Sequence, residues 1–249
     1  MRERLYQQLD SALSRFKRAP YKVDRSIPLS LFFGVLIRRG VWLLRGMAKT
    51  LLLQRRLRLV FMAKDVTLRG APLIHFGRGV TLERGVIMDG LMRRGITLGD
   101  HVMIGPYSVL AGAPVSNIGE GIVMGANSAV NAYSFLGSSG AITIGKNVIM
   151  GQHVCFHPEN HNFDRLDIPV KAQGTTRQGI VIEDDVWVGS NVTFLDGVHV
   201  GQGSVIGAGA VVRGTIPPYS IAVGVPARVV RSRKPKEPVD AISMSSSMK

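Results

Sequence analysis

Residues 118–151 read IGEGIVMGANSAVNAYSFLGSSGAITIGKNVIMG, a stretch in which an aliphatic residue returns at nearly every sixth position, commonly followed by a small residue. The pairs are Ile118-Gly119, Met124-Gly125, Val130-Asn131, Leu136-Gly137, Ile144-Gly145 and Met150-Gly151. A period of six belongs neither to an amphipathic helix nor to an alternating strand. Three such units make one coil with three flat faces, and coils of this kind bury their aliphatic side chains by stacking on one another. The stretch therefore predicts a β-solenoid.

The same period extends in both directions, from Leu98 to Arg213, with a break after Phe156. This pattern resembles the hexapeptide-repeat family, whose chains form left-handed parallel β-helices and are mostly acyltransferases, and the resemblance covers roughly residues 73–230. It implies an all-β solenoid, a left-handed parallel β-helix with an N-terminal helical segment and an excursion loop. We expect a basic amphipathic helical region at 1–65, the β-helix domain at 66–230 with its loop at 157–180, and a basic, disordered tail at 231–249.

The segment from Ile27 to Met62 is apolar but interrupted by basic residues. Its longest uncharged stretch, residues 26–37, is shorter than the roughly 20 apolar residues that a membrane-spanning helix needs. On a helix, one face would carry Arg38, Arg45, Lys49 and Arg56. Two interpretations stay open: a basic amphipathic helix lying in an anionic membrane interface, which we slightly favour, and a helix that covers the open end of the solenoid.

The net charge of the chain is +14, with the excess near the two ends of the sequence. Neither basic cluster is interleaved with the aromatic residues that stack on bases, so we expect no nucleic-acid partner. Anionic lipid and the phosphates of a nucleotide-bearing cofactor explain the charge better. The single cysteine, Cys155, excludes a disulfide within the chain, and we interpret it as an inward-facing packing residue. We expect a cytoplasmic protein, peripheral on the inner face of the cytoplasmic membrane.

The repeat breaks between Phe156 and Ile182, and an insertion of this length in a solenoid is expected to form a loop at one corner. Its sequence from His161 to Gln173-Gly174 resembles the loop of polysaccharide O-acetyltransferases and of the maltose and galactoside acetyltransferases. The resemblance implies that His161 is the general base, a role that suits a side chain titrating near neutral pH. His157 remains an alternative base. We expect no metal, because Pro158 interrupts the helix that the spacing of His153, His157 and His161 would need.

Two further motifs complete the resemblance. It implies that Asn131 contacts the acceptor sugar, although a corner asparagine in a left-handed turn would explain the same residue. Residues 185–190 and 206–212 resemble the signature for acetyl-coenzyme A. The positions implied to contact this cofactor are Trp187, Gly189, Ser190, Ala208, Arg213, Arg228 and Arg231. Where many relatives have Thr-Lys-Asp, this chain has residues 213–215 as Arg-Gly-Thr, so that Arg213 replaces the positive charge of the lysine.

Together these motifs predict an acetyl-coenzyme A dependent O-acetyltransferase acting on a sugar hydroxyl of a bacterial surface or exported polysaccharide, or of its lipid-linked precursor. We expect direct transfer, because no residue has the character of a covalent nucleophile. The resemblance also implies a homotrimer. Two alternatives stay open: an acetyltransferase of a small soluble acceptor such as a free sugar, an antibiotic or serine, and a non-catalytic solenoid scaffold.

Overall fold

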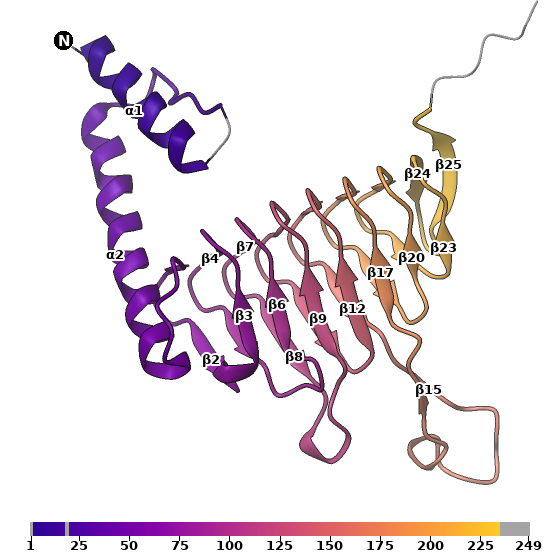
Figure 1. Ribbon diagram of the computed structural model, residues 1–249. Helices are drawn as coiled ribbons and strands as arrows, with labels where there is room; N and C mark the ends of the chain where they lie inside the picture. Colours follow the sequence, from indigo (N-terminus) through magenta and orange to yellow (C-terminus); the bar gives the residue numbers. More distant parts are fainter. Residues whose placement is uncertain (1, 18–19, 235–249) are drawn as a thin grey trace, which may run out of the picture.

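The computed structural model describes residues 2–17 and 20–234 and consists of two helices followed by a parallel β-solenoid of about seven turns (Figure 1). Helix α1 is Arg2–Lys17 and helix α2 is Leu29–Gln54. The predicted fold class, a left-handed parallel β-helix with an N-terminal helical segment and an excursion loop, is confirmed.

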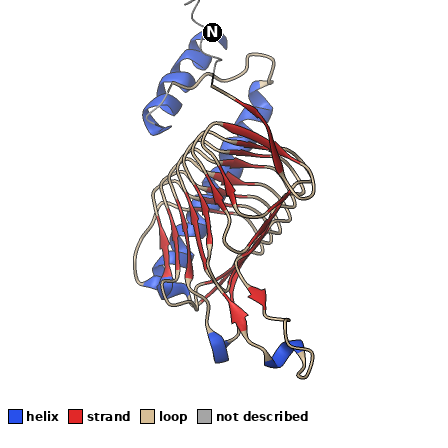
Figure 2. Cartoon of the chain, turned by 90° about the vertical axis from the view of Figure 1, so that its right-hand side faces the viewer, coloured by secondary structure: helices blue, strands red, loops and turns tan. Residues whose placement is uncertain are grey.

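Three sheets form the walls of the solenoid, and successive strands of the chain pass from sheet A to sheet B to sheet C (Figure 2). Sheet A contains β1 (Phe61–Met62), β4 (Thr81–Leu82), β7 (Met103–Ile104), β10 (Ala129–Val130), β13 (Ile149–Met150), β18 (Trp187–Val188), β21 (Val205–Ile206), β24 (Ser220–Val223) and β25 (Arg228–Ser232). Sheet B contains β2 (Thr67–Arg69), β5 (Ile87–Asp89), β8 (Val109–Gly112), β11 (Phe135–Ser138), β14 (Cys155–His157), β19 (Thr193–Leu195) and β22 (Val211–Val212). Sheet C contains β3 (Ile74–Phe76), β6 (Ile96–Leu98), β9 (Gly121–Met124), β12 (Ala141–Ile144), β17 (Ile180–Ile182), β20 (His199–Val200) and β23 (Thr215–Ile216).

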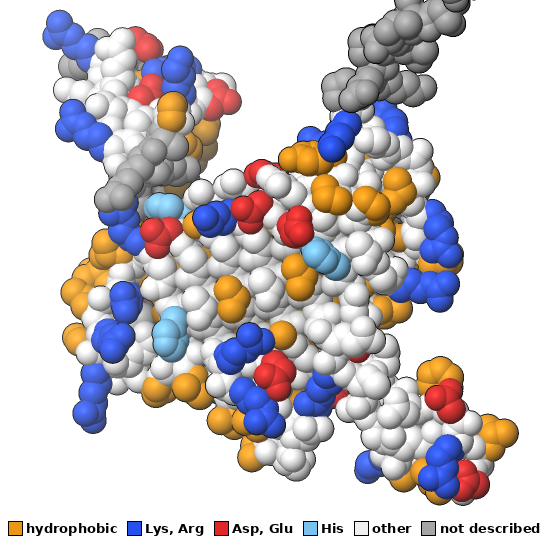
Figure 3. All heavy atoms as spheres, turned by 45° about the vertical axis from the view of Figure 1, so that its right-hand side comes forward, with side chains coloured by type: hydrophobic (Ala, Val, Ile, Leu, Met, Phe, Trp, Pro, Cys, Tyr) orange, Lys and Arg blue, Asp and Glu red, His pale blue; other side chains and the backbone are white. Residues whose placement is uncertain are grey.

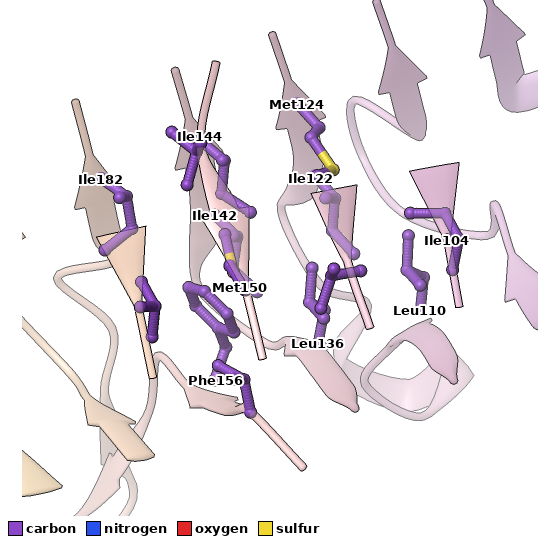
Figure 4. Close-up of a cluster of buried hydrophobic side chains, with 14 of the residues drawn as sticks. Ile104, Leu110, Ile122, Met124, Leu136, Ile142, Ile144, Met150, Phe156 and Ile182 are labelled. Atoms are coloured by element: carbon purple, nitrogen blue, oxygen red, sulfur yellow. The ribbon is translucent and has the colours of Figure 1, made fainter. Parts of the chain in front are cut away.

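The aliphatic repeat fills the interior of the solenoid. In sheet A, register pairs Ile104 with Val130, Met150, Val188 and Ile206 in successive coils, and these side chains are buried. Figure 4 shows such side chains from neighbouring coils pointing into one shared core. Each coil therefore buries its apolar side chains against its neighbours, as the six-residue period requires.

Residues at the corners of the coils adopt the left-handed backbone conformation, with positive φ. Asn127, at the corner between sheets C and A, has φ 60°, and Tyr107 and Tyr133, at the corner between sheets A and B, have φ 58°. Asparagine tolerates this left-handed conformation better than most residues. Buried serines support the corners from inside, as where Ser108 and Ser134 both donate hydrogen bonds to the carbonyl oxygen of Asn131.

Helix α2 lies across the N-terminal end of the solenoid (Figure 1) and packs against β1. Arg45 donates a hydrogen bond to the carbonyl oxygen of Met62 at 3.2 Å, and Lys49 donates one to that of Val66. These two cations thus contact the first coil, as expected for a helix that covers the open end of the solenoid. The carbonyl oxygens of Met62 and Val66 have no preceding strand to pair with, and they accept these hydrogen bonds because a buried carbonyl needs a donor.

One smaller expectation, which concerns Cys155, changes. Cys155 lies between the inward-facing residues Val154 and Phe156 and is itself only partly buried, because side chains alternate across a strand. The first strand of the solenoid begins at Phe61, and the last strand, β25, folds back antiparallel on β24 and ends at Ser232. The expected tail beyond residue 234 lies outside the described residues.

Candidate active site

The excursion loop leaves the solenoid at the corner between sheets B and C, after β14, and projects from the body with charged and apolar side chains at its tip (Figure 3). At its base, β15 (Asn160–His161) pairs with β16 (Thr175–Thr176) in antiparallel fashion, which places His161 opposite Thr175. A short 3-10 helix, η3 (Val170–Ala172), lies between these two strands. The loop therefore has its own small scaffold, and His161 is part of that scaffold.

Polar contacts anchor the base of the loop to the coils. The buried carboxylate of Asp196 accepts hydrogen bonds from the backbone nitrogens of Gln178 and Gly179 at 2.8 and 2.9 Å. Arg177 forms an ion pair with Glu159 at 2.5 Å across the two arms of the loop. The point where the chain returns to the solenoid is thus held by charged groups, and this limits how far His161 can move.

Gln173 organises the interior of the loop. Its side chain accepts a hydrogen bond from the backbone nitrogen of Arg165 at 3.0 Å and donates one to the carbonyl oxygen of the same residue at 2.7 Å. Asn162, next to His161, donates from its side chain to the carbonyl oxygen of Gln173 at 3.0 Å. The hydrogen bond from Arg165 lowers the pKa of the Asp167 carboxyl, so the loop carries a compact ion pair. The motif residues flanking the histidine therefore shape the loop.

The three histidines near the loop have different surroundings. His161 is exposed, and within the described residues its ring has no hydrogen-bond partner. His157 lies on the outer side of sheet B with its ring 5.8 Å from that of Phe135. His153 stacks on Tyr133 at 5.3 Å between ring centroids, in a corner with φ 57°. No group of three or more His, Cys, Asp or Glu side chains in residues 2–17 and 20–234 is placed to hold a metal ion.

Asn131, Gly189, Ser190 and Ala208 lie at the corner between sheets A and B. The register that pairs Val188 with Ile206 puts Ser190 and Ala208 at the same point of successive coils. A Cβ on Gly189 would lie 2.5 Å from the backbone nitrogen of Ala208, so glycine is required where the coils meet this closely. The hydroxyl of Ser190 donates to Gln152 at 2.9 Å, and the Asn131 side chain accepts from the backbone nitrogen of Ala132 at 2.8 Å.

A groove of about 500 Å³ runs along the outer side of sheet A, toward the corner between sheets C and A. Its lining combines an apolar surface with two arginines: Ile149, Trp187, Val205, Ile221, Arg231 and Arg233. Asn147 and Asp185 line it as well and are joined by a hydrogen bond of 3.1 Å. Such a surface can hold a long, partly apolar ligand that carries phosphate at one end, because guanidinium groups bind phosphate oxygens well.

Arg233 is a groove residue that the sequence analysis did not assign to the cofactor. Arg233 follows Arg231 by two positions, and residues spaced by two in an extended chain point to the same side. This spacing in the sequence indicates that Arg233 faces the same groove as Arg231. Its guanidinium donates to the carbonyl oxygen of Gly203, which holds the end of the chain against the corner of the last coils. The nearby Arg228 donates to the carbonyl oxygen of Ala227 at 2.9 Å. Arg213 lies elsewhere, at the corner between sheets B and C.

One chain therefore holds the predicted site residues in three separate places. His161 and Arg213 lie at the corner between sheets B and C, whereas Asn131, Ser190 and Ala208 lie at the corner between sheets A and B. The full width of sheet B separates these corners, and the groove with Trp187 and Arg231 lies on the outer side of sheet A, toward the third corner. No single coil unites the histidine with the groove.

Comparison with known proteins identifies the repeat. Residues 179–214 match the family described as bacterial transferase hexapeptide (six repeats), so this part of the chain carries the repeat of the hexapeptide transferases, and the resemblance predicted from the sequence is confirmed. The match covers the six strands that follow the loop, β17 to β22, and includes Ser190 and Ala208 at their corner.

Curated relatives match over shorter segments. A probable acetyltransferase of Mycobacterium tuberculosis is 47% identical over 75 residues, which are 30% of this chain and 25% of the relative. The "Putative lipopolysaccharide biosynthesis O-acetyl transferase WbbJ" of Escherichia coli is 42% identical over 65 residues, 26% of this chain and 33% of the relative. The chain thus spans a quarter to a third of the length of these two relatives.

A solved structure aligns over more of the chain. The N-acyltransferase AntD from Bacillus cereus, in complex with dTDP and 3-hydroxybutyryl-CoA, is 19% identical and aligns with 70% of this chain and 80% of its own, with a TM-score of 0.47.

Proposed function

We propose that this protein transfers an acetyl group from acetyl-coenzyme A to a sugar hydroxyl, with His161 as the general base. The observation that carries the proposal is the placement of His161 at the base of an anchored loop, exposed to solvent, in a chain that also has an arginine-lined apolar groove. The repeat family and the acetyltransferase relatives support the same reaction class.

In the proposed reaction, the sugar hydroxyl oxygen attacks the thioester carbon while the His161 ring accepts its proton. The bond from carbon to sulfur then breaks, and the leaving coenzyme thiolate takes up the proton from the His161 ring, which returns to its neutral form. In this proposal the backbone N–H of Ser190 donates a hydrogen bond to the oxyanion that develops on the carbonyl, a large stabilising effect in many acyl transfers. Asn131 holds the acceptor hydroxyl through its carboxamide.

The proposed active unit is a trimer, because the site is incomplete within one chain. His161 and the corner that holds Ser190 lie on opposite edges of sheet B. When three solenoids stand side by side, the loop of one chain can meet the groove and the Ser190 corner of the next. The separation of the two half-sites in one chain is the support for this proposal.

The acceptor we propose is a bacterial surface or exported polysaccharide, or its lipid-linked precursor, modified beside a membrane. The similarity to WbbJ, whose name refers to lipopolysaccharide biosynthesis, favours a glycan over a free small molecule. A protein acting on a free sugar, an antibiotic or serine is the second candidate. It would release thiol with those soluble acceptors as fast as with glycan extracts.

The first test measures thiol release from acetyl-coenzyme A in the presence of glycan acceptors. His161→Ala should lower turnover by about 100-fold or more, the usual loss for a general base, while acetyl-coenzyme A affinity measured by calorimetry stays nearly unchanged. His75→Ala is the matched control and should keep its turnover, because that exposed side chain lies on β3, near the N-terminal end of the solenoid. Full turnover of the His161 variant would reject it as the base and move the role to His157.

A complementation experiment tests the shared site. His161→Ala removes the proposed base, and Ser190→Trp blocks the corner with a large side chain. Each variant alone is expected to be inactive. When the two are coexpressed, mixed trimers should recover part of the activity, because some interfaces pair an intact loop with an intact corner. Absence of any recovery in mixed trimers of verified composition would place both half-sites in one chain.

A further inference from the structure

Helix α2 has an exposed apolar face on the side opposite the solenoid. One side of the helix meets the first coil through Gly46 and the buried Thr50. The exposed large apolar residues of the opposite side, which we call the outer strip, are Phe33, Ile37, Val41, Leu44, Leu51 and Leu52. Their spacing of three, four and seven places most of them along one line of the helix. Ile37 and Leu44 are 69% and 67% exposed, so the strip has no cover within the described residues.

A cationic cleft lies beside the outer strip, between α2 and the first coils. Its volume is about 540 Å³, and it is lined by Arg38, Val41, Trp42, Arg45, Ala63, Lys64 and Arg84. Arg38 lies 5.8 Å from the centre of the Trp42 ring. Four of the lining residues are basic, and within residues 2–17 and 20–234 the one ion pair that they form joins Arg84 to Asp65 at the surface. The cleft therefore carries a net positive charge next to an aromatic surface.

The surrounding sequence has no acidic residue that could neutralise this region from α2. Asp and Glu are absent from residues 25–64, which contain nine basic residues. The nearest acidic residues from the packed coils are Asp65, on Arg84, and Glu83, whose charge acts on Arg39. An exposed apolar strip with cationic flanks has the chemistry of a surface that binds anionic lipid.

We propose that the outer strip and the cationic cleft together dock the protein on an anionic phospholipid bilayer, with the strip in the interface and a lipid phosphate in the cleft. A second copy of the chain fits less well, because a two-fold contact through the strip would bring the same arginines together. No helix among the described residues is long and apolar enough to cross a membrane, so the proposed contact lies in the plane of the surface.

The fold then sets the orientation of the rest of the molecule. Because α2 crosses the end of the stack of coils (Figure 1), a docked α2 makes the solenoid stand upright on the membrane. The coil that bears the excursion loop lies four strand spacings beyond β1 in sheet A, which is about 20 Å from the docked end. His161 would therefore act on an acceptor held above the bilayer. This inference deepens the proposed membrane association and is independent of the transfer chemistry.

The test is sedimentation of the full chain with vesicles of phosphatidylcholine alone and of phosphatidylcholine with about 30% phosphatidylglycerol. Binding is expected to the second composition and to weaken with salt. Ile37→Glu with Leu44→Glu should lower the bound fraction at least tenfold, and Arg38→Glu should lower it on anionic vesicles. The matched controls, Val115→Glu at another exposed apolar residue and Arg94→Glu at another exposed arginine, should bind as the natural chain does.

Tryptophan fluorescence locates the contact without relying on the charged variants. The chain has two tryptophans, so Trp187→Phe leaves Trp42 as the single reporter and Trp42→Phe leaves Trp187. Anionic vesicles should shift the emission of Trp42 to shorter wavelength and leave that of Trp187 unchanged. Equal binding by the Ile37/Leu44 double variant, a shift at Trp187 alone, or a change in oligomeric state without vesicle binding would each overturn the proposal. Acetyl transfer that persists in solution would leave the proposed reaction intact in every case.

Discussion

Helix α2 and the excursion loop are two departures from the same repeat, and they are attached to the solenoid in different ways. At the helix, long side chains reach out to the coil: Arg45 and Lys49 donate to carbonyl oxygens of the first coil, and Gln54 donates to those of Ala71 and Ile74. At the loop, the direction is reversed, because the coil residue Asp196 accepts hydrogen bonds from backbone nitrogens of the returning chain.

The two attachments differ because each leaves a different kind of backbone group in need of a hydrogen-bond partner. The first coil has no preceding strands, so its edge exposes carbonyl oxygens, and cations with long side chains are suited to meet them. The loop returns into a stack that is already paired, so its free groups are backbone N–H donors, which a carboxylate accepts. The attachment of α2 therefore covers the N-terminal end of the solenoid, and the attachment of the loop holds the segment that carries His161.

Changing Gly46 should produce the largest loss of stability. A Cβ at this position would lie 1.8 Å from the carbonyl oxygen of Val60, so Gly46→Val must push α2 away from the first coil. We expect the free energy of unfolding, measured with urea, to fall by about 3 kcal/mol. Gly40→Ala, on the same helix with open space around it, should instead raise stability by up to about 1 kcal/mol. Equal effects at both positions would mean that α2 is not seated on the coil.

Removing the anchor of the loop should have the next largest effect. Asp196→Ala leaves the backbone nitrogens of Gln178 and Gly179 without their acceptor, and we expect a loss of about 2 kcal/mol. Hydrogen exchange should become faster in the loop while α2 remains protected. Asp167→Asn, at an exposed position of the loop, serves as the control and should change stability by less than about 0.5 kcal/mol. Loss of protection at α2 in the Asp196 variant would show that the two attachments are coupled.

The smallest expected effect concerns a link between regular coils. Glu183 accepts hydrogen bonds from His199 and from the backbone nitrogen of Gln202, and these lower the pKa of its carboxyl. Because the pKa is lower in the folded state, the contribution is present above the ordinary glutamate pKa of about 4.3 and is lost as pH falls through the folded value. Glu183→Gln should therefore flatten the acid limb of a plot of stability against pH. An unchanged acid limb would show that the partly exposed pair contributes nothing.

Much of this structure could be predicted from the repeat. The inward positions of Ile104, Val130 and Val188, the left-handed corner at Asn127 and the stacking of Ser190 on Ala208 all follow from counting residues around a coil. The excursion loop could also be predicted from the sequence, because residues inserted into the repeat of a solenoid form a loop outside the coil. Local periodicity carries this information because every coil repeats the same contacts.

Other features depended on contacts that the period does not encode. A helical pattern shows that Arg45 and Lys49 share a face, but the orientation of that face depends on which surface α2 meets. Arg213 lies at the corner between sheets B and C because the strand before it, β22, belongs to sheet B. The motif alone does not show which sheet a strand joins, so it assigns Arg213 and Trp187 to the same cofactor site. The sequence predicts an inward Cys155 because its neighbours Val154 and Phe156 are apolar, whereas the structure leaves it partly buried between these two inward-facing residues.

The sequence by itself determined that the chain winds into coils, where those coils turn, and where the loop with His161 leaves them, since each of these is set by contacts between residues a fixed number of positions apart. Only the tertiary structure decided that α2 turns Arg45 and Lys49 toward the first coil and its apolar strip outward, and that His161 and Ser190 lie on opposite edges of sheet B. Those arrangements depend on how distant segments pack in three dimensions, where unpaired carbonyl oxygens and open surfaces arise only after the coils have stacked.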